Sequence, residues 1–280
     1  MNPIAILGTG PAGLMAAHAC SLSGRPFSLF SAPGKDGTVK PSRIGGAQFI
    51  HKPVPALVNE DLPDFHVTYD LRGTEAGYRE KVYGDAPVPF VSYSGVHDGE
   101  VQPAWNLRKI YDSMWEAIAG EGNSVNAVKI TGSMLKEWLD QDMWDFVVST
   151  VPRHALCLGH EGLTPSPHGF LSQDVFLANV NHADVPENTI IYNGAKEPSW
   201  YRASNLGGVH SAEWSNIAQV PSWQRSSIIK VSKPIAHSCD CWADEPRVVF
   251  AGRFGKWQKG ILVHDGFVTA AQALMDRSYL

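Results

Sequence analysis

Three glycines near the N-terminus have the spacing of a phosphate-binding turn. They are Gly8, Gly10 and Gly13, in the pattern Gly-x-Gly-x-x-Gly. In such a turn the first glycine permits a tight bend after a strand, the second lets phosphate oxygens approach the backbone, and the third lets a helix pack closely on the sheet. The helix N-terminus then offers unpaired N–H groups to a pyrophosphate. The pattern predicts a dinucleotide site; a glycine-rich turn without a ligand is the alternative.

The segments around the glycines supply the elements that the motif requires. Residues 3–7 form a continuous apolar run, residues 13–23 favour a helix of small residues, and residues 26–31 favour a second strand. This strand–turn–helix–strand order is the context in which the motif indicates dinucleotide binding. The acidic residue expected at the end of the second strand, which would bind the ribose hydroxyls, is missing, and Ser31 offers only a hydroxyl there.

Further elements follow from the apolar pattern. Residues 46–51 and the apolar, β-branched run 144–151 predict strands, and 247–251 predicts a last short one. Helical periodicity marks residues 105–119, with Trp105 on the apolar face, and a closing helix is expected over 261–276.

Three later segments, taken with the glycine turn, resemble a flavoprotein superfamily. Residues 250–257 read Phe-Ala-Gly-Arg-Phe-Gly-Lys-Trp before an amphipathic stretch, residues 43–48 read Arg-Ile-Gly-Gly-Ala-Gln, and residues 145–152 end in Ser-Thr-Val-Pro. In order and spacing these are similar to the FAD-dependent amine oxidase and UDP-galactopyranose mutase superfamily. The resemblance covers about a quarter of the chain, all of it in the cofactor domain.

The resemblance implies FAD as the cofactor and an α/β fold. The expected architecture is a Rossmann-like FAD-binding domain of the glutathione-reductase type with an inserted, trimmed α+β substrate domain. The FAD-binding domain would be discontinuous, over residues 1–65, 121–155 and 236–280, and the substrate domain would comprise 66–120 and 156–235.

The resemblance also implies which residues contact FAD. The glycine turn would bind the pyrophosphate, the loop after the second strand would pass near the phosphate or the flavin, and the late Gly-Arg turn would close over the cofactor. The implied cofactor-binding residues are Gly8, Gly10, Pro11, Ala12, Gly13, Ser31, Arg43, Gly46, Ala47, Gln48, Val151, Gly252, Arg253 and Ile261.

Catalytic candidates are fewer, because flavin chemistry needs little from the protein beyond positioning and electrostatics. Lys259 is a candidate for a lysine near the flavin, or else a solvated charge. His51 is a candidate polar group on the substrate side, or a structural histidine. Tyr201 and Arg202 are candidates for an aromatic wall and an anion-binding guanidinium, or for a strand with one packed ring and one exposed charge.

The cysteines predict no metal site. The chain has four, Cys20, Cys157, Cys239 and Cys241. Cys239-Asp-Cys241 is tighter than the usual zinc spacing, and no second ligand pair accompanies it in the sequence. Reduced thiols in a cytoplasmic protein are the expectation.

Composition limits the partners. With 44% hydrophobic and 18% charged residues, the chain has enough apolar material for a core. The formal charge of −5 is not typical of a general nucleic-acid binder, although net charge does not exclude a local basic groove. Without a secretory signal or an apolar stretch of about 20 residues, the expectation is a cytoplasmic protein without membrane contact.

These patterns favour a FAD-dependent oxidoreductase. The expected reaction is oxidation of a C–N bond in an amine or amino-acid-like group by hydride transfer to flavin N5, with oxygen or another electron acceptor. Small members of the superfamily occur in bacteriophage genomes beside amine-bearing modified thymidine, so the substrate is expected to be a small molecule or a modified nucleotide. A mutase-like isomerase and a non-catalytic dinucleotide-binding protein are the alternatives.

Overall fold

The computed structural model describes residues 2–41, 48–84, 99–120, 125–160, 168–179 and 184–277. The chain divides into two compact units. Unit 1 comprises Met1–Ser42, Lys109–Leu171 and Pro234–Leu280, and unit 2 comprises Arg43–Arg108 and Ser172–Lys233. Compared with the predicted domain bounds, residues 43–65 fall in unit 2, and residues 109–120, 156–171 and 234–235 fall in unit 1.

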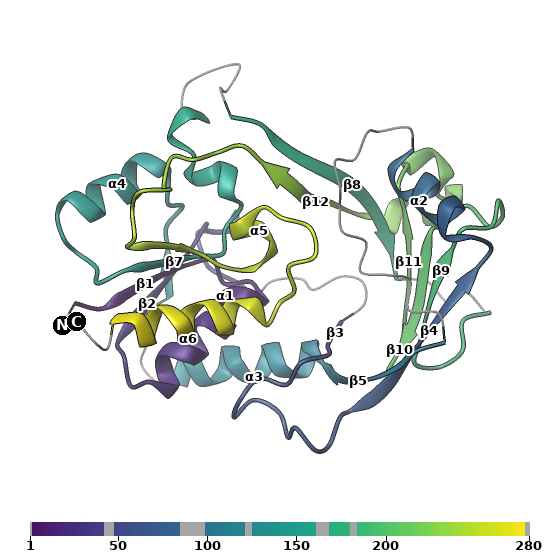
Figure 1. Ribbon diagram of the computed structural model, residues 1–280, viewed down its shortest axis with the longest axis horizontal. Coiled ribbons are helices and arrows are strands. Elements are labelled where there is room, and N and C mark those ends of the chain that lie inside the picture. The colour runs from purple at the N-terminus through teal and green to yellow at the C-terminus, as the bar shows by residue number, and fades with distance from the viewer. Residues whose placement is uncertain are drawn as a thin grey trace. The chain divides into compact units, whose positions relative to one another are not determined.

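Unit 1 contains a parallel five-stranded sheet in the order β13-β7-β1-β2-β6 (Figure 1). Parallel strands are covered on both faces and therefore need continuous apolar runs; all residues of β1 and β7 are buried. Strands were predicted at 3–7, 26–31, 144–151 and 247–251, and each is confirmed with shorter bounds. The strands are β1 (Ile4–Leu7), β2 (Phe27–Ser31), β6 (Val125–Ala127), β7 (Val147–Ser149) and β13 (Val248–Phe250).

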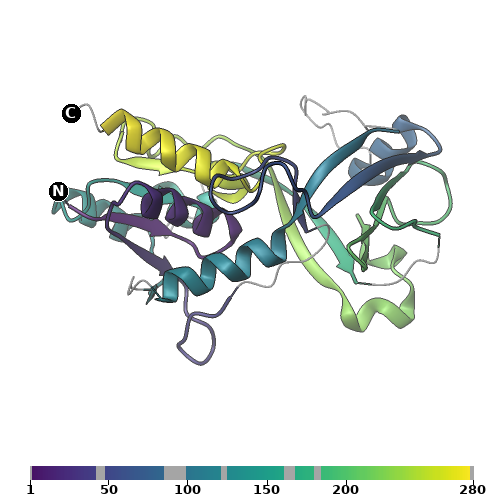
Figure 2. The same cartoon turned by 90° about the horizontal axis from the view of Figure 1, so that it is seen from below.

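Helices cover both faces of this sheet. Figure 2 shows α6, in yellow, beside α1, in purple, and Gly266 of α6 allows the two helices to approach closely, because a Cβ on it would lie 2.1 Å from the Ala12 carbonyl oxygen. On the other face, Leu135 and Leu139 of α4 pack against Phe30 and Val147. The helices are α1 (Pro11–Leu22), α3 (Leu107–Gly120), α4 (Gly132–Asp140), α5 (Gly252–Lys256) and α6 (Asp265–Arg277), with 3-10 turns η1 (Arg153–Leu156) and η2 (Leu158–His160).

Two predicted helices begin later than expected. Helix α3 begins at Leu107, and Trp105 belongs to strand β5, so it is not part of the helix's apolar face. Helix α6 begins at Asp265 rather than at residue 261. A separate short helix, α5, lies before it at Gly252–Lys256, and Trp257 ends α5 in the left-handed conformation with φ 47°.

Most of an eight-stranded sheet, in the order β12-β8-β11-β10-β9-β4-β5-β3, lies in unit 2. Its pairings are largely antiparallel, but β4 and β9 are parallel. Helix α2 follows β4 and is capped by Thr74, whose Oγ1 accepts from the Gly77 amide at 3.1 Å. The elements are β3 (Phe49–Ile50), β4 (Phe65–Arg72), α2 (Glu75–Tyr83), β5 (Val101–Asn106), β8 (Phe170–Ala178), β9 (Thr189–Asn193), β10 (Arg202–Leu206), β11 (Val209–Trp214), η3 (Ile217–Gln219), η4 (Ser222–Ser227) and β12 (Ile229–His237).

The predicted fold class is confirmed: a Rossmann-like α/β unit is accompanied by a second unit with its own sheet. Among the helices that the structure describes, none has the length and apolar character needed to cross a bilayer.

Candidate functional site

Two of the three motif glycines are closely enclosed. Gly8 has φ +103°, and a Cβ placed on it would lie 2.5 Å from Thr150 Oγ1. A Cβ on Gly13 would lie 1.9 Å from the carbonyl oxygen of Gly8. Heavy atoms do not approach so closely, so any side chain at Gly13 would push α1 away from the turn after β1. These two glycines hold the helix N-terminus against the sheet.

Gly10, between them, is different. It is the N-cap of α1 with φ −70°, and no atom lies within 4 Å of a Cβ placed on it. Leu14 donates the first intrahelical hydrogen bond to the Gly10 carbonyl, so the amides of Ala12 and Gly13 precede the first helical bond. Pro11 at the first helical position has no N–H to satisfy. The first turn carries no acidic side chain, so the open helix terminus is suited to an anion.

Three hydroxyl groups fix the turn from its surroundings. Thr9 Oγ1 donates to Ser31 Oγ at 3.1 Å, so the serine at the end of β2 does lie beside the turn. The buried Tyr111 hydroxyl of α3 donates to the Thr9 carbonyl at 2.9 Å. Thr150 Oγ1 donates to the Leu7 carbonyl at 2.9 Å. Sequence reasoning missed Tyr111 and Thr150, because nothing in their local pattern shows which loop they reach.

The late Gly-Arg turn lies on the first turn of α1. Gly252 has φ +69°, and its Cβ would lie 2.6 Å from the Ala12 Cβ. Asp265 at the start of α6 holds this turn: its Oδ2 accepts from the Gly252 amide at 2.8 Å, and its Oδ1 pairs with Lys256 Nζ at 2.7 Å. Asp265 was not among the residues that the resemblance implied.

The other predicted cofactor residues are placed less specifically. Val151 lies beside the turn, its Cγ1 3.3 Å from a Cβ placed on Gly8. Arg253 and Ile261 are half-buried, in α5 and in the segment that follows it. Gln48 lies in unit 2, where its Oε1 accepts from Arg108 Nε at 3.4 Å. Outside the described residues are Arg43, Gly46 and Ala47. Contact of these residues with a cofactor stays a prediction.

In unit 2 a buried carboxylate organises two of the catalytic candidates. Glu213 is only 2% exposed. It pairs with Arg202 and with Lys233 Nζ at 2.9 Å, and it accepts from the Tyr201 hydroxyl at 2.7 Å. Burial alone would raise the pKa of Glu213, but Arg202 and Lys233 together hold that pKa well below its usual range. Arg202 and Tyr201 therefore share one internal partner, and Arg202 remains half-buried at the edge of this network.

Tyrosine rings lie beside this network. Tyr192 is directly opposite Arg202 in the β9–β10 register. Its ring stacks on Tyr69 with centroids 6.0 Å apart and is met edge-on by Tyr78 at 5.2 Å. Burial raises the pKa of Tyr69 well above its usual range, so the phenol stays protonated. These rings form an aromatic wall that the sequence interpretation did not identify beyond Tyr201.

His51 is held at the other side of Tyr69. His51 Nδ1 lies 2.9 Å from the Pro103 carbonyl, which only accepts, so Nδ1 carries the proton. In the neutral ring Nε2 then accepts from the Tyr69 hydroxyl. In unit 1, Lys259 is half-buried and its backbone amide donates to the Ile235 carbonyl at 3.1 Å. The catalytic roles of His51 and Lys259 stay predictions.

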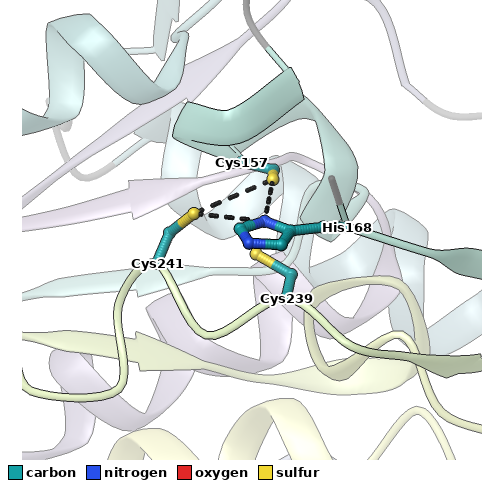
Figure 3. Close-up of side chains that lie close together, drawn as sticks. All are labelled: Cys157, His168, Cys239 and Cys241. Carbon is teal, nitrogen blue, oxygen red and sulfur yellow. Dashed lines mark hydrogen bonds between the residues drawn. The ribbon is translucent and has the colours of Figure 1, made fainter. Parts of the chain in front are cut away.

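A cluster of sulfur and imidazole in unit 1 corrects the expectation for the cysteines. Cys239 and Cys241 do have a second ligand pair, because Cys157 and His168 lie beside them (Figure 3). The ligand atoms of all four side chains lie within 4.8 Å of one another. The sequence interpretation missed this cluster because Cys157 is separated from Cys241 by 84 residues and comes near it only in the fold.

Comparison with known proteins places this geometry in a fold family. No protein-family model and no curated protein matches the sequence. Among solved structures, the chain is similar to a reduced UDP-galactopyranose mutase, with a TM-score of 0.59 and 14% identity over 100% of this chain and 94% of the other. The chain has the fold of that mutase.

Two further structures have a similar fold. One is a putrescine oxidase bound to putrescine, with a TM-score of 0.50 and 11% identity over 100% of this chain and 99% of the other. The second is 2,6-dihydroxypyridine-3-hydroxylase from Arthrobacter nicotinovorans, with a TM-score of 0.50 and 11% identity over 98% and 82% of the two chains. These similarities confirm the predicted fold.

Proposed function

We propose that the protein is an FAD-dependent oxidoreductase that oxidises a C–N bond of an amine. The observation that carries the proposal is the glycine turn: an open Gly10 lies between two closely enclosed glycines at the N-terminus of α1. The open position leaves room for phosphate oxygens to approach the backbone at Gly10. It occurs in a fold shared with a mutase and an amine oxidase.

The residues of unit 1 would divide the cofactor between them. The amides at Gly10, Ala12 and Gly13 would bind the pyrophosphate, where the helix dipole favours negative charge. The Ser31 hydroxyl would meet the ribose, and the turn at Gly252 would meet the flavin end. Bound FAD supplies a two-electron acceptor for a hydride.

The proposed reaction is a two-electron oxidation of the amine in which oxygen is reduced to hydrogen peroxide. The carbon next to the amine nitrogen loses a hydride, the nitrogen loses a proton, and an imine forms. Water then hydrolyses the imine to a carbonyl compound and ammonia. Molecular oxygen takes the two electrons and two protons and leaves as hydrogen peroxide.

The aromatic wall of unit 2 supports an amine as the substrate. Tyr69 and Tyr78 are buried and Tyr192 is half-buried, and their rings lie in stacked and edge-on contact with one another. Aromatic faces attract cationic groups and pack against alkyl chains, as the substrate of a diamine oxidase would require. The putrescine oxidase with a similar fold binds a diamine.

The mutase alternative has less support from this unit. Recognition of a nucleotide diphosphate calls for arginines available to the phosphates. Arg202 instead pairs with the buried Glu213, which offsets its charge. A free amine and an amine-bearing nucleobase present the same reacting group, so the proposal covers both sources.

The test asks whether the protein oxidises amines with its flavin. The FAD-loaded protein is mixed with putrescine and other primary amines without oxygen, and bleaching of the flavin absorbance is followed; peroxide is then measured in air. An oligonucleotide with an amine-bearing thymidine is the parallel substrate, and UDP-galactopyranose tests isomerisation. Amine-dependent bleaching with peroxide supports the proposal. Isomerisation without net oxidation, or stable FAD that no amine reduces, contradicts it.

A further inference from the structure

The four clustered side chains have the dimensions of a tetrahedral metal site. Zinc bonds of about 2.3 Å to sulfur and about 2.0–2.1 Å to nitrogen give tetrahedron edges of about 3.8 Å between sulfurs and about 3.5 Å between sulfur and nitrogen. Cys157 Sγ lies 3.8 Å from Cys241 Sγ, and Cys241 Sγ lies 3.5 Å from His168 Nδ1. Cys157 Sγ is 3.1 Å from the same nitrogen. Figure 3 shows the His168 ring among the three sulfurs.

A carboxylate beside the cluster is positioned to orient its histidine. Asp240 Oδ1 lies 3.5 Å from His168 Nε2, the ring nitrogen opposite the one that faces the thiols. A carboxylate at this position orients a metal-binding histidine and makes it a better donor. Because Asp240 separates Cys239 from Cys241, the tight Cys-Asp-Cys sequence supplies two ligands and the carboxylate together.

A guanidinium near the cluster suits anionic sulfur ligands. Arg153 donates to the Cys239 carbonyl at 3.4 Å. Three thiolates around a divalent cation carry one net negative charge, which such donors stabilise.

We propose that Cys157, His168, Cys239 and Cys241 bind one Zn²⁺ ion in a closed structural site. Each thiol gives up its proton on binding, and the neutral imidazole donates through Nδ1. Three sulfurs and one nitrogen fill the tetrahedron, which is typical of structural rather than catalytic zinc. Mixed thiolate and imidazole ligands also disfavour magnesium and calcium, which require oxygen.

The proposed zinc would connect two loops of unit 1 that are distant in sequence. Cys157 lies between η1 and η2, whereas Cys239 and Cys241 follow β12. The neighbouring Trp242 indole donates to the Leu156 carbonyl at 2.7 Å and packs in the core of the parallel sheet. The ion would therefore fix both loops to that core.

The test begins with metal analysis of the full chain purified under reducing conditions. We expect about one zinc per chain, and X-ray absorption at the zinc edge should show three sulfur ligands and one nitrogen. Replacement with Co²⁺ should give the absorption of a tetrahedral thiolate complex in the red, where oxidised flavin does not absorb. Asp240→Asn should weaken metal binding about 10–100-fold without removing a ligand.

A matched pair of variants checks the assignment. Cys239→Ser combined with Cys241→Ser should lose the zinc, and Cys20→Ala, which changes a buried cysteine outside the cluster, should keep it. The proposal is overturned by a wild-type chain that neither contains nor takes up Zn²⁺ or Co²⁺, by a spectrum dominated by oxygen ligands, or by a disulfide among these cysteines in the freshly purified chain. FAD content, measured in the same samples, plays no part in this decision.

Discussion

A Cβ placed on Gly13 would lie 1.9 Å from the carbonyl oxygen of Gly8, whereas one placed on Gly10 would meet nothing within 4 Å. Gly10 and Gly13 therefore have different roles within the same motif. Gly13 is required for the fold, because α1 rests on the turn after β1. Gly10 is required only if something outside the chain approaches the helix terminus.

The first prediction uses this difference. Gly10→Ala should fold with an unchanged melting temperature, since φ −70° and ψ 174° suit alanine, but should bind FAD at least about 10-fold more weakly. Gly13→Ala should lose several kcal/mol of unfolding free energy, roughly 3 or more, through the forced displacement of α1. Thermal unfolding and FAD titration of both variants check this. Equal FAD affinity for Gly10→Ala and wild type would remove the phosphate role of Gly10.

The second prediction concerns Asp265, which connects the start of α6 to the Gly252 turn. Asp265→Asn keeps the side-chain size but loses the charge that pairs with Lys256 and strengthens the bond to the Gly252 amide. We expect a loss of about 1–3 kcal/mol in unfolding free energy and weaker FAD binding. Lys256→Met, which removes the half-buried ion pair and a hydrogen bond to Thr269 Oγ1 but leaves the Asp265 bond to the Gly252 amide, should cost about 0–1 kcal/mol. Equal effects of the two substitutions would show that the Gly252 contact is unimportant.

The third prediction is a pH dependence at Glu213. Arg202 and Lys233 hold the pKa of this carboxyl below its usual range in the folded state. Its stabilisation is therefore present above the unfolded pKa of about 4.3 and is lost as the pH falls below that value, by at most about 1.4 kcal/mol per pH unit.

Glu213→Gln isolates this contribution. At neutral pH it should cost about 3–5 kcal/mol, because two cations lose their buried partner. The difference between wild type and variant should shrink between about pH 4.3 and pH 3. Denaturant unfolding at several pH values measures it; a difference that stays constant with pH would mean that Glu213 is not an ionised partner in the fold.

The fourth prediction tests the aromatic wall. Tyr192→Leu removes the ring that stacks on Tyr69, and Tyr192→Phe keeps it. If the wall binds the amine, the leucine variant should raise KM about 5–30-fold, corresponding to about 1–2 kcal/mol, with the phenylalanine variant close to wild type. Steady-state peroxide production gives both constants. A leucine variant with normal KM would place the substrate elsewhere.

Local pattern was sufficient to predict the glycine turn and the strands beside it. Strands β1 and β2, the glycine turn and the late Gly-Arg turn are each encoded within a few residues, and the structure brings Ala12, Ser31, Val151 and Gly252 to one turn. Their positions follow from the strand–turn–helix order, which a linear sequence displays directly.

Long-range partners were not predictable in the same way. Tyr111 reaches Thr9 across 102 residues, and Cys157 reaches Cys241 across 84, so neither pair leaves a local signal. In the second unit, Arg202 and Tyr201 suggested a substrate site, but a single sequence cannot show that Glu213 lies opposite them on the next strand. Strand pairing, rather than residue type, determines what these side chains contact.

The visible absorption spectrum of the purified full chain tests most directly whether FAD binds at the glycine turn. We expect oxidised-flavin bands near about 375 and 450 nm, about one FAD per chain, and a lower FAD content in Gly10→Ala. A colourless wild-type protein that takes up no added FAD would contradict the central claim and leave the glycine turn without the ligand proposed for it.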